Sequence, residues 1–299
     1  MALVLDGKQC SLDLREKLKR EVAVMAEKGL RPPHLAAIIV GNNGASETYV
    51  AAKAKACDEA GFFSTVLRFP ESITQDELLA EIENINTNPD IDGLIVQLPL
   101  PKHISEEDIT QAIHPSKDVD GFHDISMGKL AKGEPSFIPA TPYGIVLLLR
   151  HYKIETSGKH CVVVGRSNIV GRPMSILMSM PGDTGNCTVT ICHSRTHDLS
   201  YFTRQADIVI AALGKPLFVK ADMVKEGAVV IDVGITRVDA PEKKSGFRLL
   251  GDVDYDAVAP LCSAITPVPG GVGPMTIAGL LMNTLQARKQ TLQPGSSLA

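Results

Sequence analysis

The first half of the chain alternates between two hydrophobic patterns. Short apolar or alternating runs predict strands at residues 35–40, 63–69 and 93–97. Apolar residues at helical spacing, with capping residues before several of them, predict helices at 11–28, 46–60 (with Ser46 as N-cap), 74–86 and from 105 onward. Because strands and helices alternate, we expect parallel β-α-β units.

A change of pattern separates this half from the rest. Between residues 118 and 142 the periodicity fades and Gly and Pro become frequent, which indicates a passage between domains. A second alternating series then predicts a helix at 141–152 and strands at 161–164, 187–192, 207–212 and 228–233. The segment 265–274 is too rich in Pro and Gly for a helix or an inner strand, 275–289 predicts a closing helix, and 290–299 predicts a frayed tail. No internal repeat stands out.

The strand at 161–164 runs into Gly165 and then into an amphipathic segment that begins near Ile169, which predicts a buried strand turning into a helix. Gly165 allows a tight turn, Gly171 allows a ligand or a neighbouring strand to approach, and Pro173 suits a first helical turn. Free amides and the helix dipole at this place suit a phosphate. Because the spacing is not G-x-G-x-x-G, a purely structural turn is an equal alternative to a dinucleotide site.

The length, composition and net charge of the chain mainly exclude classes of protein and partner. A chain of 299 residues that is 44% hydrophobic and 21% charged is typical of a globular protein with two domains. Its net charge of -4 argues against nucleic acids and anionic membranes as partners, and no signal peptide or membrane span is visible. The six cysteines are scattered and form no C-x-x-C pair, so we expect a cytoplasmic protein without disulfides or a metal.

The strand at 187–192 ends without an acidic residue. In a Rossmann unit an acid at this place bonds the ribose hydroxyls and repels a 2′-phosphate. Here His193, Ser194 and Arg195 follow instead, and a hydroxyl with a guanidinium suits the 2′-phosphate of NADP. Arg166 would add a second positive contact, although both arginines would equally fit a solvated surface.

The first half of the chain contains several candidate catalytic or binding residues: a lysine with a nearby tyrosine, a glutamine and two aspartates. Tyr49 and Lys53 share one helix face, and Lys53 stands among alanines, where its amine can lose a proton and act as a base unless it is simply solvated. Gln97 ends a predicted strand, where it would meet a ligand or cap a loop. A carboxylate at Asp118 or Asp120 would accept paired N–H groups from a flat heterocycle, or form an Asx turn.

Set together, these segments resemble the bifunctional methylenetetrahydrofolate dehydrogenase/methenyltetrahydrofolate cyclohydrolase family. The matching segments are 49–53, 96–101, 117–122, 165–167 with 170–171, 232–235 and 266–276. They follow the family's order over nearly the whole chain, and the run from Pro267 to Thr276 is highly specific.

The resemblance implies an α/β fold of two domains. A catalytic, folate-binding domain would comprise residues 1–142 and a C-terminal helix, 275–299, that returns to it, and residues 143–274 would form a Rossmann-type NADP-binding domain. The implied activity is oxidation of 5,10-methylenetetrahydrofolate with NADP⁺, followed by hydrolysis of the methenyl product to 10-formyltetrahydrofolate, in one-carbon metabolism. The implied assembly is a homodimer.

The resemblance also assigns residues to roles. It places catalysis at Lys53, Gln97, Tyr49 and Asp120, with Asp120 rather than Asp118 as the acid that holds the pterin. It places NADP binding at Gly165, Arg166, Ser167, Ser194, Arg195 and Ile235. It places substrate binding at Tyr49, Val96, Gln97, Leu98, Asp120, Pro269, Gly270 and Gly271.

One segment departs from the pattern. The long connection at 180–186 is expected close to the place where the cofactor is chosen, and some relatives with longer connections favour NAD, so NAD is the second candidate. Two other functions remain as alternatives. One is an NAD(P)-dependent dehydrogenase of another small substrate on a related scaffold, and the other is a non-catalytic folate- or NADP-binding protein. The combination of Tyr49, Lys53, Gln97 and Asp120 favours the folate enzyme.

Overall fold

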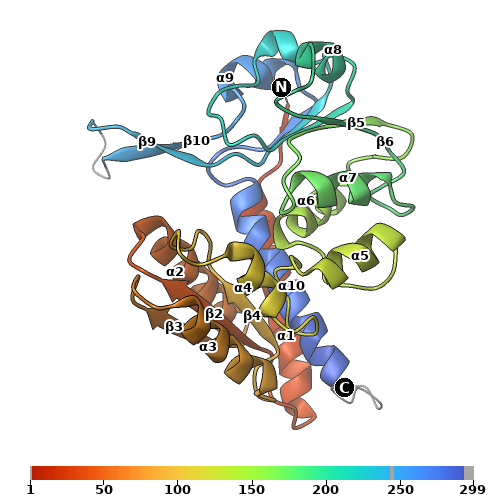
Figure 1. Cartoon of the computed structure of the whole chain (residues 1–299). Helices are drawn as coiled ribbons and strands as arrows, with labels where there is room; N and C mark the ends of the chain where they lie inside the picture. The colour runs from red at the N-terminus through yellow and green to blue at the C-terminus, as the bar shows by residue number, and fades with distance from the viewer. Residues whose placement is uncertain (1, 243–245, 293–299) are drawn as a thin grey trace. The chain divides into compact units, whose positions relative to one another are not determined.

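The computed structural model describes residues 2–242 and 246–292, which form two compact units (Figure 1). Unit 1 consists of Met1–Ser11 and Thr141–Thr276, and unit 2 consists of Leu12–Ala140 and Ile277–Ala299. The closing helix thus belongs from Ile277 onward with the first half of the chain, as expected. Residues 1–11, which the sequence placed in the first domain, group with unit 1 instead.

Unit 2 is built around a parallel sheet of three strands in the order β3-β2-β4. Its strands are β2 (His34–Val40), β3 (Phe63–Phe69) and β4 (Gly93–Val96). Its helices are α1 (Gly7–Glu27, from Leu12), α2 (Gly44–Glu59), α3 (Gln75–Thr87), α4 (Glu106–Ala112), α5 (Asp124–Lys132) and the greater part of α10 (Val272–Thr291). The predicted capping box at Thr74 and Glu77 is present, and Ser105 caps α4.

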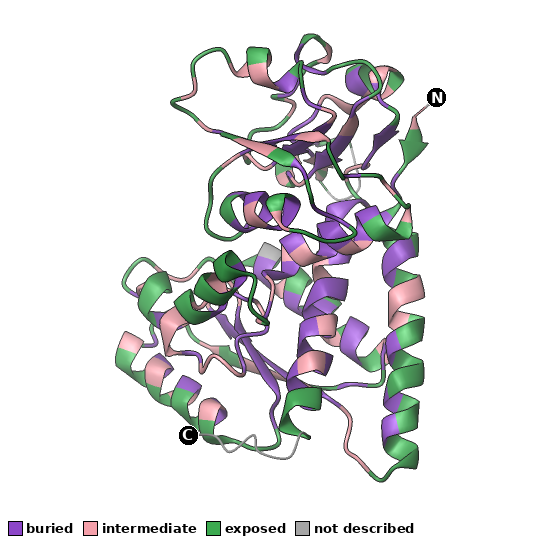
Figure 2. Cartoon of the chain, turned by 90° about the vertical axis from the view of Figure 1, so that its right-hand side faces the viewer, coloured by how far each residue is buried: buried purple, intermediate pink, exposed green. Residues whose placement is uncertain are grey.

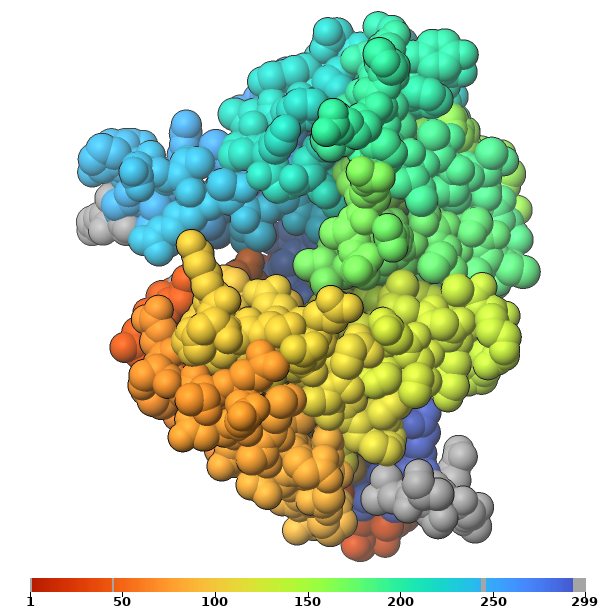
Figure 3. Space-filling model, viewed as in Figure 1, coloured from red at the N-terminus to blue at the C-terminus, as the bar shows by residue number. Residues whose placement is uncertain are grey.

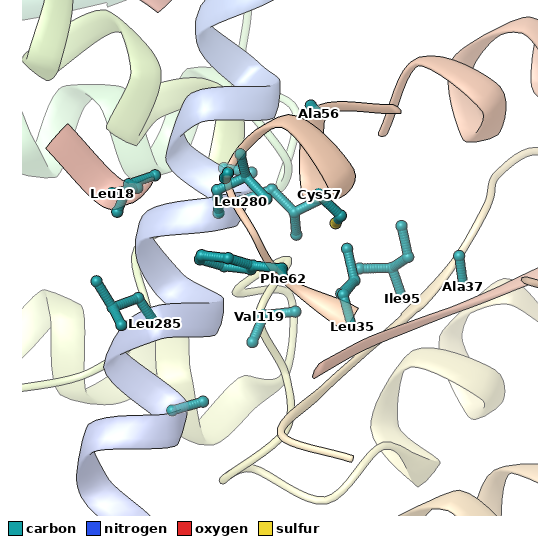
Figure 4. Packing of buried hydrophobic residues seen from close by; sticks show 14 of the residues in the cluster. Leu18, Leu35, Ala37, Ala56, Cys57, Phe62, Ile95, Val119, Leu280 and Leu285 are labelled. Atoms are coloured by element: carbon teal, nitrogen blue, oxygen red, sulfur yellow. The ribbon is translucent and has the colours of Figure 1, made fainter. Parts of the chain in front are cut away.

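The core of unit 2 forms because each strand of its sheet carries apolar side chains on both faces. Figure 2 shows the buried residues concentrated in the strands and along one side of the helices. On one face, Phe62 lies between the α10 residues Leu280 and Leu285 and the strand residues Leu35 and Ile95 (Figure 4). A parallel sheet covered on both faces explains why β2 is a continuous apolar run in the sequence.

Unit 1 contains a parallel sheet of six strands in the order β1-β11-β8-β7-β5-β6. These strands are β1 (Leu3–Val4), β5 (His160–Val164), β6 (Thr188–Cys192), β7 (Ile208–Ala211), β8 (Val229–Asp232) and β11 (Ala264–Ile265). Its helices are α6 (Ala140–His151), α7 (Gly171–Ser179), α8 (Leu199–Thr203), α9 (Tyr255–Val258), the 3₁₀ helices η1 (Ala221–Met223) and η2 (Ala259–Leu261), and the start of α1 and α10.

Unit 1 also carries an antiparallel hairpin that the sequence did not predict. It pairs β9 (Thr236–Asp239) with β10 (Phe247–Leu250) and extends away from the six-stranded sheet (Figure 1). In the space-filling view its atoms project from the rest of unit 1 (Figure 3). The guanidinium of Arg237 lies 3.6 Å from the ring centroid of Phe247, a cation–π contact across the two strands. Mixed polar and apolar residues on both faces gave this hairpin no clear alternation to detect.

The two parallel sheets share a set of hydrogen bonds at the start of their central strands. The sequence analysis missed this similarity, since it found no internal repeat. In unit 2, His34 opens the central strand, and its Nε2 pairs with the hydroxyl of Thr65 on the neighbouring strand at 2.9 Å. Its backbone N–H donates to Asp92, which precedes the third strand, at 2.8 Å. These contacts tie the amino ends of all three strands together.

The same contacts occur in unit 1. His160 opens β5, its Nε2 pairs with the hydroxyl of Thr190 at 3.0 Å, and its backbone N–H donates to Asp207 at 2.9 Å. The strand orders also correspond, since β2 lies between β3 and β4 just as β5 lies between β6 and β7. The repeat is therefore structural, with His, Thr and Asp at matching positions, and in both units the Asp also donates its backbone N–H to the carbonyl of the His, at 3.0 Å and 2.9 Å.

Several local predictions were wrong. Helix α5 occupies part of the segment expected as an irregular passage, because His123 caps its start and Gly133, with a φ of 72°, ends it. Helix α2 begins at Gly44, two residues before the expected cap, and the Asn43 side chain accepts the N–H of Ser46 at 3.2 Å.

The Pro- and Gly-rich segment at 265–274 also contains regular structure. Ile265 lies in β11, an inner strand between β1 and β8, and α10 already begins at Val272 with Pro274 in its first turn. The expected tail at 290–299 starts too early, because α10 continues to Thr291 and the remainder from 293 lies outside the described residues.

Three structural features concern the sequence expectations on membrane spans, disulfides and metal sites. Across residues 2–242 and 246–292, no helix is both long and apolar enough to cross a membrane. All six cysteines are buried, and none of them forms a disulfide within the part of the chain that the structure describes. The same ranges contain no group of three or more His, Cys, Asp or Glu side chains placed to hold a metal ion.

Candidate functional site

The amine of Lys53 is held against the amide of Gln97 in unit 2. Lys53 lies on α2 one turn after Tyr49, and it is only 8% exposed. Its Nζ donates to Oε1 of Gln97 at 3.1 Å, while Nε2 of Gln97 donates to the carbonyl of Leu98 at 2.8 Å. The second bond fixes the orientation of the amide, so its oxygen faces the amine. Of the two roles that the sequence left open for Gln97, the structure thus shows the bond to its own loop, and contact with a ligand stays a prediction.

Asp118 is a structural acid. It is 1% exposed, and its carboxylate accepts hydrogen bonds from the backbone of Phe122 at 3.0 Å, from the backbone of His123 at 2.9 Å and from the hydroxyl of Ser126 at 2.7 Å. Burial raises the pKa of Asp118 to about 6, although these hydrogen bonds oppose the shift. All of its contacts order the loop that leads into α5, so it has little capacity left for a ligand.

Asp120 differs from Asp118 in having its carboxylate unengaged. Among the described residues no donor hydrogen-bonds to that carboxylate, and its strongest charged neighbour is Lys53. Burial raises the pKa of Asp120, and the positive charge of Lys53 opposes that shift. Lys53, Gln97 and Asp120 thus form one cluster, which we name the lysine cluster, and Asp120 is its available acceptor.

Asn283 supports the lysine cluster from α10. It is fully buried, and its Nδ2 donates to the carbonyl of Val119 at 2.8 Å and to the carbonyl of Ile138 at 2.8 Å. The backbone of Asp120 in turn accepts the N–H of Ala140 at 3.2 Å. These bonds hold the segment that carries Asp120, a role that the sequence analysis missed. The available signal was a lone amide within the apolar run of α10.

The remaining residues assigned to substrate in unit 2 lie beside the lysine cluster. Tyr49 is partly exposed, and burial of its ring raises the pKa of the hydroxyl. The side chain of Val96 is part of an apolar core, so only its backbone can contribute to a ligand site. Leu98 is half-buried and directly follows Gln97.

The predicted glycine turn is present in unit 1 at the carboxyl end of β5. Gly165 has a φ of +135°, and a Cβ placed on it would lie 2.2 Å from the carbonyl oxygen of Ala212. A Cβ on Gly171 would lie 2.3 Å from the oxygen of Gly165. The neighbour that requires Gly171 is therefore the turn's own backbone and not another strand.

Ser167 occupies amides that we expected to be free for a phosphate. Its Oγ accepts the N–H of Val170 at 3.2 Å and the N–H of Gly171 at 3.3 Å. Helix α7 thus begins with a side chain satisfying its first donors. An anion at this turn would rely on the arginine nearby as well as on the helix end.

Both candidate arginines lie in loops that leave the six-stranded sheet at the carboxyl ends of two neighbouring strands, β5 and β6. Val164 and Cys192 are register partners, and Gly165 donates its N–H to the carbonyl of Cys192 at 2.9 Å. The turn that contains Arg166 and the loop that contains Arg195 consequently leave neighbouring strands at the same edge. Both arginines and Ser194 are exposed there.

The acid nearest to this loop in sequence has another partner. Asp198 caps α8, since its side chain accepts the N–H of Tyr201 at 3.1 Å. The three residues that directly follow β6, His193, Ser194 and Arg195, include no acid, and the carboxylate of Asp198 is directed at the start of α8.

The long connection at 180–186 lies at the other end of β6. It precedes Thr188, the first residue of the strand, whereas Ser194 and Arg195 follow the last. Five residues of extended chain separate the two ends by roughly 16 Å. Thr184 is fixed by Nε of Arg150 at 2.7 Å, and the expectation that this connection lies close to the loop of Ser194 and Arg195 is wrong.

The other assigned residues of unit 1 lie in two loops. Ile235 is exposed and follows β8. Gly270 accepts the N–H of Lys8 at 2.9 Å, and the oxygen of Gly271 approaches Gly7 so closely that no side chain would fit there. Pro269 precedes them and is exposed. This loop is thus ordered by the first residues of α1.

Comparison with known proteins gives a match in both parts of the chain. Residues 5–120 match the model of the tetrahydrofolate dehydrogenase/cyclohydrolase catalytic domain, and residues 139–292 match that of the NAD(P)-binding domain of the same family. A curated relative, the bifunctional protein FolD of Cytophaga hutchinsonii, is 62% identical over 284 residues, which cover 95% of this chain and 98% of the relative.

Solved structures agree with these matches. The bifunctional FolD dehydrogenase/cyclohydrolase of Campylobacter jejuni is 48% identical with a TM-score of 0.91, and the match covers 97% of this chain and 100% of that one. The methylenetetrahydrofolate dehydrogenase-cyclohydrolase of Trypanosoma brucei, complexed with NADP cofactor and inhibitor, is 37% identical with a TM-score of 0.92 and covers 98% and 99%. With both domains matched in order over nearly its full length, the chain belongs to the tetrahydrofolate dehydrogenase/cyclohydrolase family.

Proposed function

We propose that this protein oxidises 5,10-methylenetetrahydrofolate to the methenyl form and hydrolyses that product to 10-formyltetrahydrofolate, in one-carbon metabolism. Its membership of the bifunctional family supports both activities. The observation that carries the assignment to residues is the lysine cluster, where the buried amine of Lys53 faces the oxygen of Gln97 and the charge of Asp120. The alternatives, a dehydrogenase of another substrate and a silent binding protein, have no such support.

Asp120 holds the pterin in this proposal. Its carboxylate is partly buried and free of hydrogen bonds among the described residues, so it can accept the paired N–H groups of a flat heterocycle. Val119 and Ile138 are tied to Asn283, which fixes the position of the acid before the substrate arrives. Tyr49 offers an aromatic surface one turn from Lys53 on the same helix.

The oxidation needs positioning more than proton transfer. A nicotinamide cofactor, when bound, would supply the acceptor for the hydride of the substrate's one-carbon bridge. We assign binding of this cofactor to unit 1, at the turn of Gly165, Arg166 and Ser167, at the loop of Ser194 and Arg195, and at Ile235. The side chains of unit 1 need only bind and orient it, because no group on the enzyme has to gain or lose a proton in this step.

Hydrolysis does need a proton acceptor, and we assign that role to Lys53. A water molecule adds to the methenyl carbon, and its proton passes to the neutral amine of Lys53. The bond from this carbon to one ring nitrogen then breaks, and that nitrogen takes up a proton from the ammonium. The hydroxyl proton of the adduct leaves to solvent as the C=O bond forms, so one proton is released overall. The formyl group stays on the other nitrogen, and Lys53 returns to its neutral form.

The charge of the intermediate favours this protonation state. A methenyl cation beside a poorly solvated amine disfavours the ammonium, because like charges repel strongly where water is scarce. Asp120 acts in the opposite direction, but hydrogen bonds from the pterin would occupy its carboxylate. Gln97 is uncharged, so it orients the amine without holding it protonated as a carboxylate would.

We propose NADP as the preferred cofactor. The support is chemical: Ser194 and Arg195 follow β6, Arg166 lies at the same sheet edge, and Asp198 is engaged in capping α8. A guanidinium and a hydroxyl suit a 2′-phosphate, and a carboxylate at this place would repel it.

We further propose that the protein acts as a cytoplasmic homodimer. The edge strand β6 has a pairing partner only on its β5 side within the described residues, and Ile191 on it is exposed. Light scattering after size-exclusion chromatography should give twice the mass of 32.0 kDa. A mass of one chain at micromolar concentration would contradict the dimer.

The test of the activity follows absorbance after mixing the protein with methylenetetrahydrofolate and either NADP⁺ or NAD⁺. Reduced cofactor with little methenyl accumulation supports both activities, and the faster cofactor decides the preference. Reduced cofactor with accumulating methenyl product would leave a dehydrogenase in which Lys53 does not act as proposed. No reduction with either cofactor would overturn the function.

A further inference from the structure

Unit 1 contains two buried acids that no part of the proposed mechanism uses. Asp232 ends β8 and is 3% exposed, while Asp252 follows β10 and is fully buried. No lysine or arginine among the described residues forms an ion pair with either of them. Burying two carboxylates without a cation is costly, so their contacts must compensate.

Asp252 accepts three backbone N–H groups from one loop. Its Oδ2 accepts from Leu213 at 2.6 Å and from Gly214 at 2.9 Å, and its Oδ1 accepts from Lys215 at 2.8 Å. These residues directly follow β7. Consecutive amides converging on one carboxylate fix the conformation of the loop.

Asp232 holds Asp252 in place. Its Oδ1 accepts the N–H of Asp252 and the N–H of Gly234, both at 2.9 Å, and its Oδ2 accepts the N–H of Val253 at 2.9 Å. The packing is close, because a Cβ on Gly234 would lie 2.4 Å from the Asp252 carboxylate and one on Gly251 would lie 1.9 Å from Asp232. Burial and the neighbouring Asp252 both raise the pKa of Asp232, which reaches about 6.

The loops that this acid pair holds lie at the edge of the sheet assigned to the cofactor. Ala212, which precedes the loop of Asp252, packs its carbonyl against Gly165 and donates its N–H to Val164 at 2.8 Å. Gly234, which bonds to Asp232, directly precedes Ile235. Nucleotides bind at the carboxyl ends of parallel strands in such sheets, and both loops begin there.

We infer that Asp252, supported by Asp232, is a positioning residue for the dinucleotide: it fixes the loop at 213–215 in the conformation that receives the cofactor. The inference rests on the proposed function, since it assumes that unit 1 binds NADP. A loop that already has its bound conformation lowers the free-energy cost of binding the cofactor. Loss of the Asp252 carboxylate should therefore weaken binding of the cofactor and leave the hydrolysis of the folate substrate intact.

The two activities of the protein distinguish a positioning role of Asp252 from a role in folding alone. Hydrolysis of methenyltetrahydrofolate consumes no cofactor, so it reports folding and the folate site in the same protein. In Asp252→Asn, an amide N–H₂ would face backbone donors. We expect the KM for NADP⁺ to rise at least about tenfold while the hydrolysis rate stays within about twofold of wild type. Asp256→Asn, an exposed acid on α9, is the control.

A second pair of variants tests the loop while both acids keep their side chains. Lys215→Pro removes the amide that bonds to Asp252, whereas Lys215→Ala retains it and removes only the side chain. We expect the proline variant to bind NADP⁺ several-fold more weakly than the alanine variant, with equal hydrolysis rates. This comparison decides the question if Asp252→Asn does not fold.

The outcomes are separable from failure of the proposed function. If the wild type reduces neither NADP⁺ nor NAD⁺, the function itself is wrong. If the wild type has both activities and the proline and alanine variants bind NADP⁺ equally well, the positioning role is overturned. Parallel loss of reduction and hydrolysis in folded Asp252→Asn would overturn it as well, because the acid would then serve the whole fold.

Discussion

Nζ of Lys53 donates a hydrogen bond to Oε1 of Gln97 over 3.1 Å, although the two residues lie 44 positions apart. One comes from a helix and the other from the end of the strand β4. The bond pairs a titratable group with a neutral acceptor, which leaves the amine able to change its charge during a reaction. Two predictions follow directly from this pairing.

Lys53→Met should remove hydrolysis and leave part of the hydride transfer. Methionine has a similar length and stays in the buried environment, but it accepts no proton. We expect the hydrolysis rate to fall by at least about a hundredfold, with methenyltetrahydrofolate accumulating during oxidation. Lys55→Met is the control, because Lys55 is exposed and forms an ion pair with Glu59 on the same helix. Unchanged hydrolysis in Lys53→Met would exclude the lysine as the base.

Gln97→Glu should slow hydrolysis at neutral pH. A carboxylate at 3 Å would stabilise the ammonium of Lys53, so the neutral amine would form only at higher pH. The rate–pH profile of hydrolysis should therefore move toward alkaline pH, while the oxidation profile stays nearly unchanged. A faster rate at pH 7 than in the wild type would contradict the orienting role of Gln97.

Much of the fold was predictable because its strands are buried on both faces. Strands such as β2 and β5 are continuous apolar runs, which the sequence displays directly. Helix α5 was missed because a glycine lies in its middle and only Ser126 and Leu130 in it are buried, so no apolar stripe marks it. Strand β1 has only two residues and needs β11 as its partner, and a pairing of this kind leaves no periodic signal.

The candidate site was predictable where side chains carry the chemistry. Lys53, Gln97 and Asp120 belong to motifs with clear spacing, and the structure brings them together. The supporting contacts were not predictable, because Asp252 and Asn283 bond to backbone groups that every residue possesses. The position of the 180–186 connection also required the strand direction, which shows that it enters β6 at the end away from Arg195.

The two acids of the 118–120 segment should respond differently to loss of charge. Asp120→Asn replaces an acceptor-only group with an amide, so we expect the KM for folate to rise about tenfold or more with little change in thermal stability. Asp118→Asn should chiefly lower stability, because its carboxylate bonds to Phe122, His123 and Ser126. Melting temperatures and KM values of both variants check this separation, and the reverse pattern would exchange their roles.

Asp118 also predicts a sign for the pH dependence of stability. Its pKa is raised by burial from 3.8 to about 6, so between these values the folded protein binds a proton that the unfolded chain releases. Its contribution to the free energy of unfolding is therefore present below about pH 4 and is lost as the pH rises through 6. Denaturant titrations at pH 4.5 and 7 should show wild type gaining on the order of 2 kcal/mol relative to Asp118→Asn on acidification. A relative loss on acidification would mean that the hydrogen bonds outweigh desolvation.

Arg195→Ala should reduce the preference for NADP⁺ over NAD⁺. Loss of a guanidinium that binds the 2′-phosphate should weaken the binding of NADP⁺ by about tenfold or more. Binding of NAD⁺ should be nearly unaffected, since NAD⁺ has no 2′-phosphate. Asp183→Ala, in the 180–186 connection, is the matched control and should leave the ratio of kcat/KM values unchanged. A ratio that responds to Asp183 rather than to Arg195 would return cofactor choice to the connection.

Asn283→Ala tests whether α10 positions the acid of the lysine cluster. The change leaves the carbonyls of Val119 and Ile138 without their buried donor, so the protein should lose about 2–4 kcal/mol of stability. Thr284→Val is the control, because Thr284 is equally buried but its hydroxyl donates to the carbonyl of Leu280 in the same helix, at 2.8 Å.

Kinetics well below the melting temperature of both variants separate the two effects. If Asn283 positions Asp120, the KM for folate rises in Asn283→Ala while the KM for NADP⁺ stays constant, and Thr284→Val changes neither. If both constants rise together in Asn283→Ala, or if Thr284→Val raises the folate KM as much, the amide serves only the packing of α10. A selective rise would instead show that the closing helix belongs to the substrate site through its hydrogen bonds to the segment that carries Asp120.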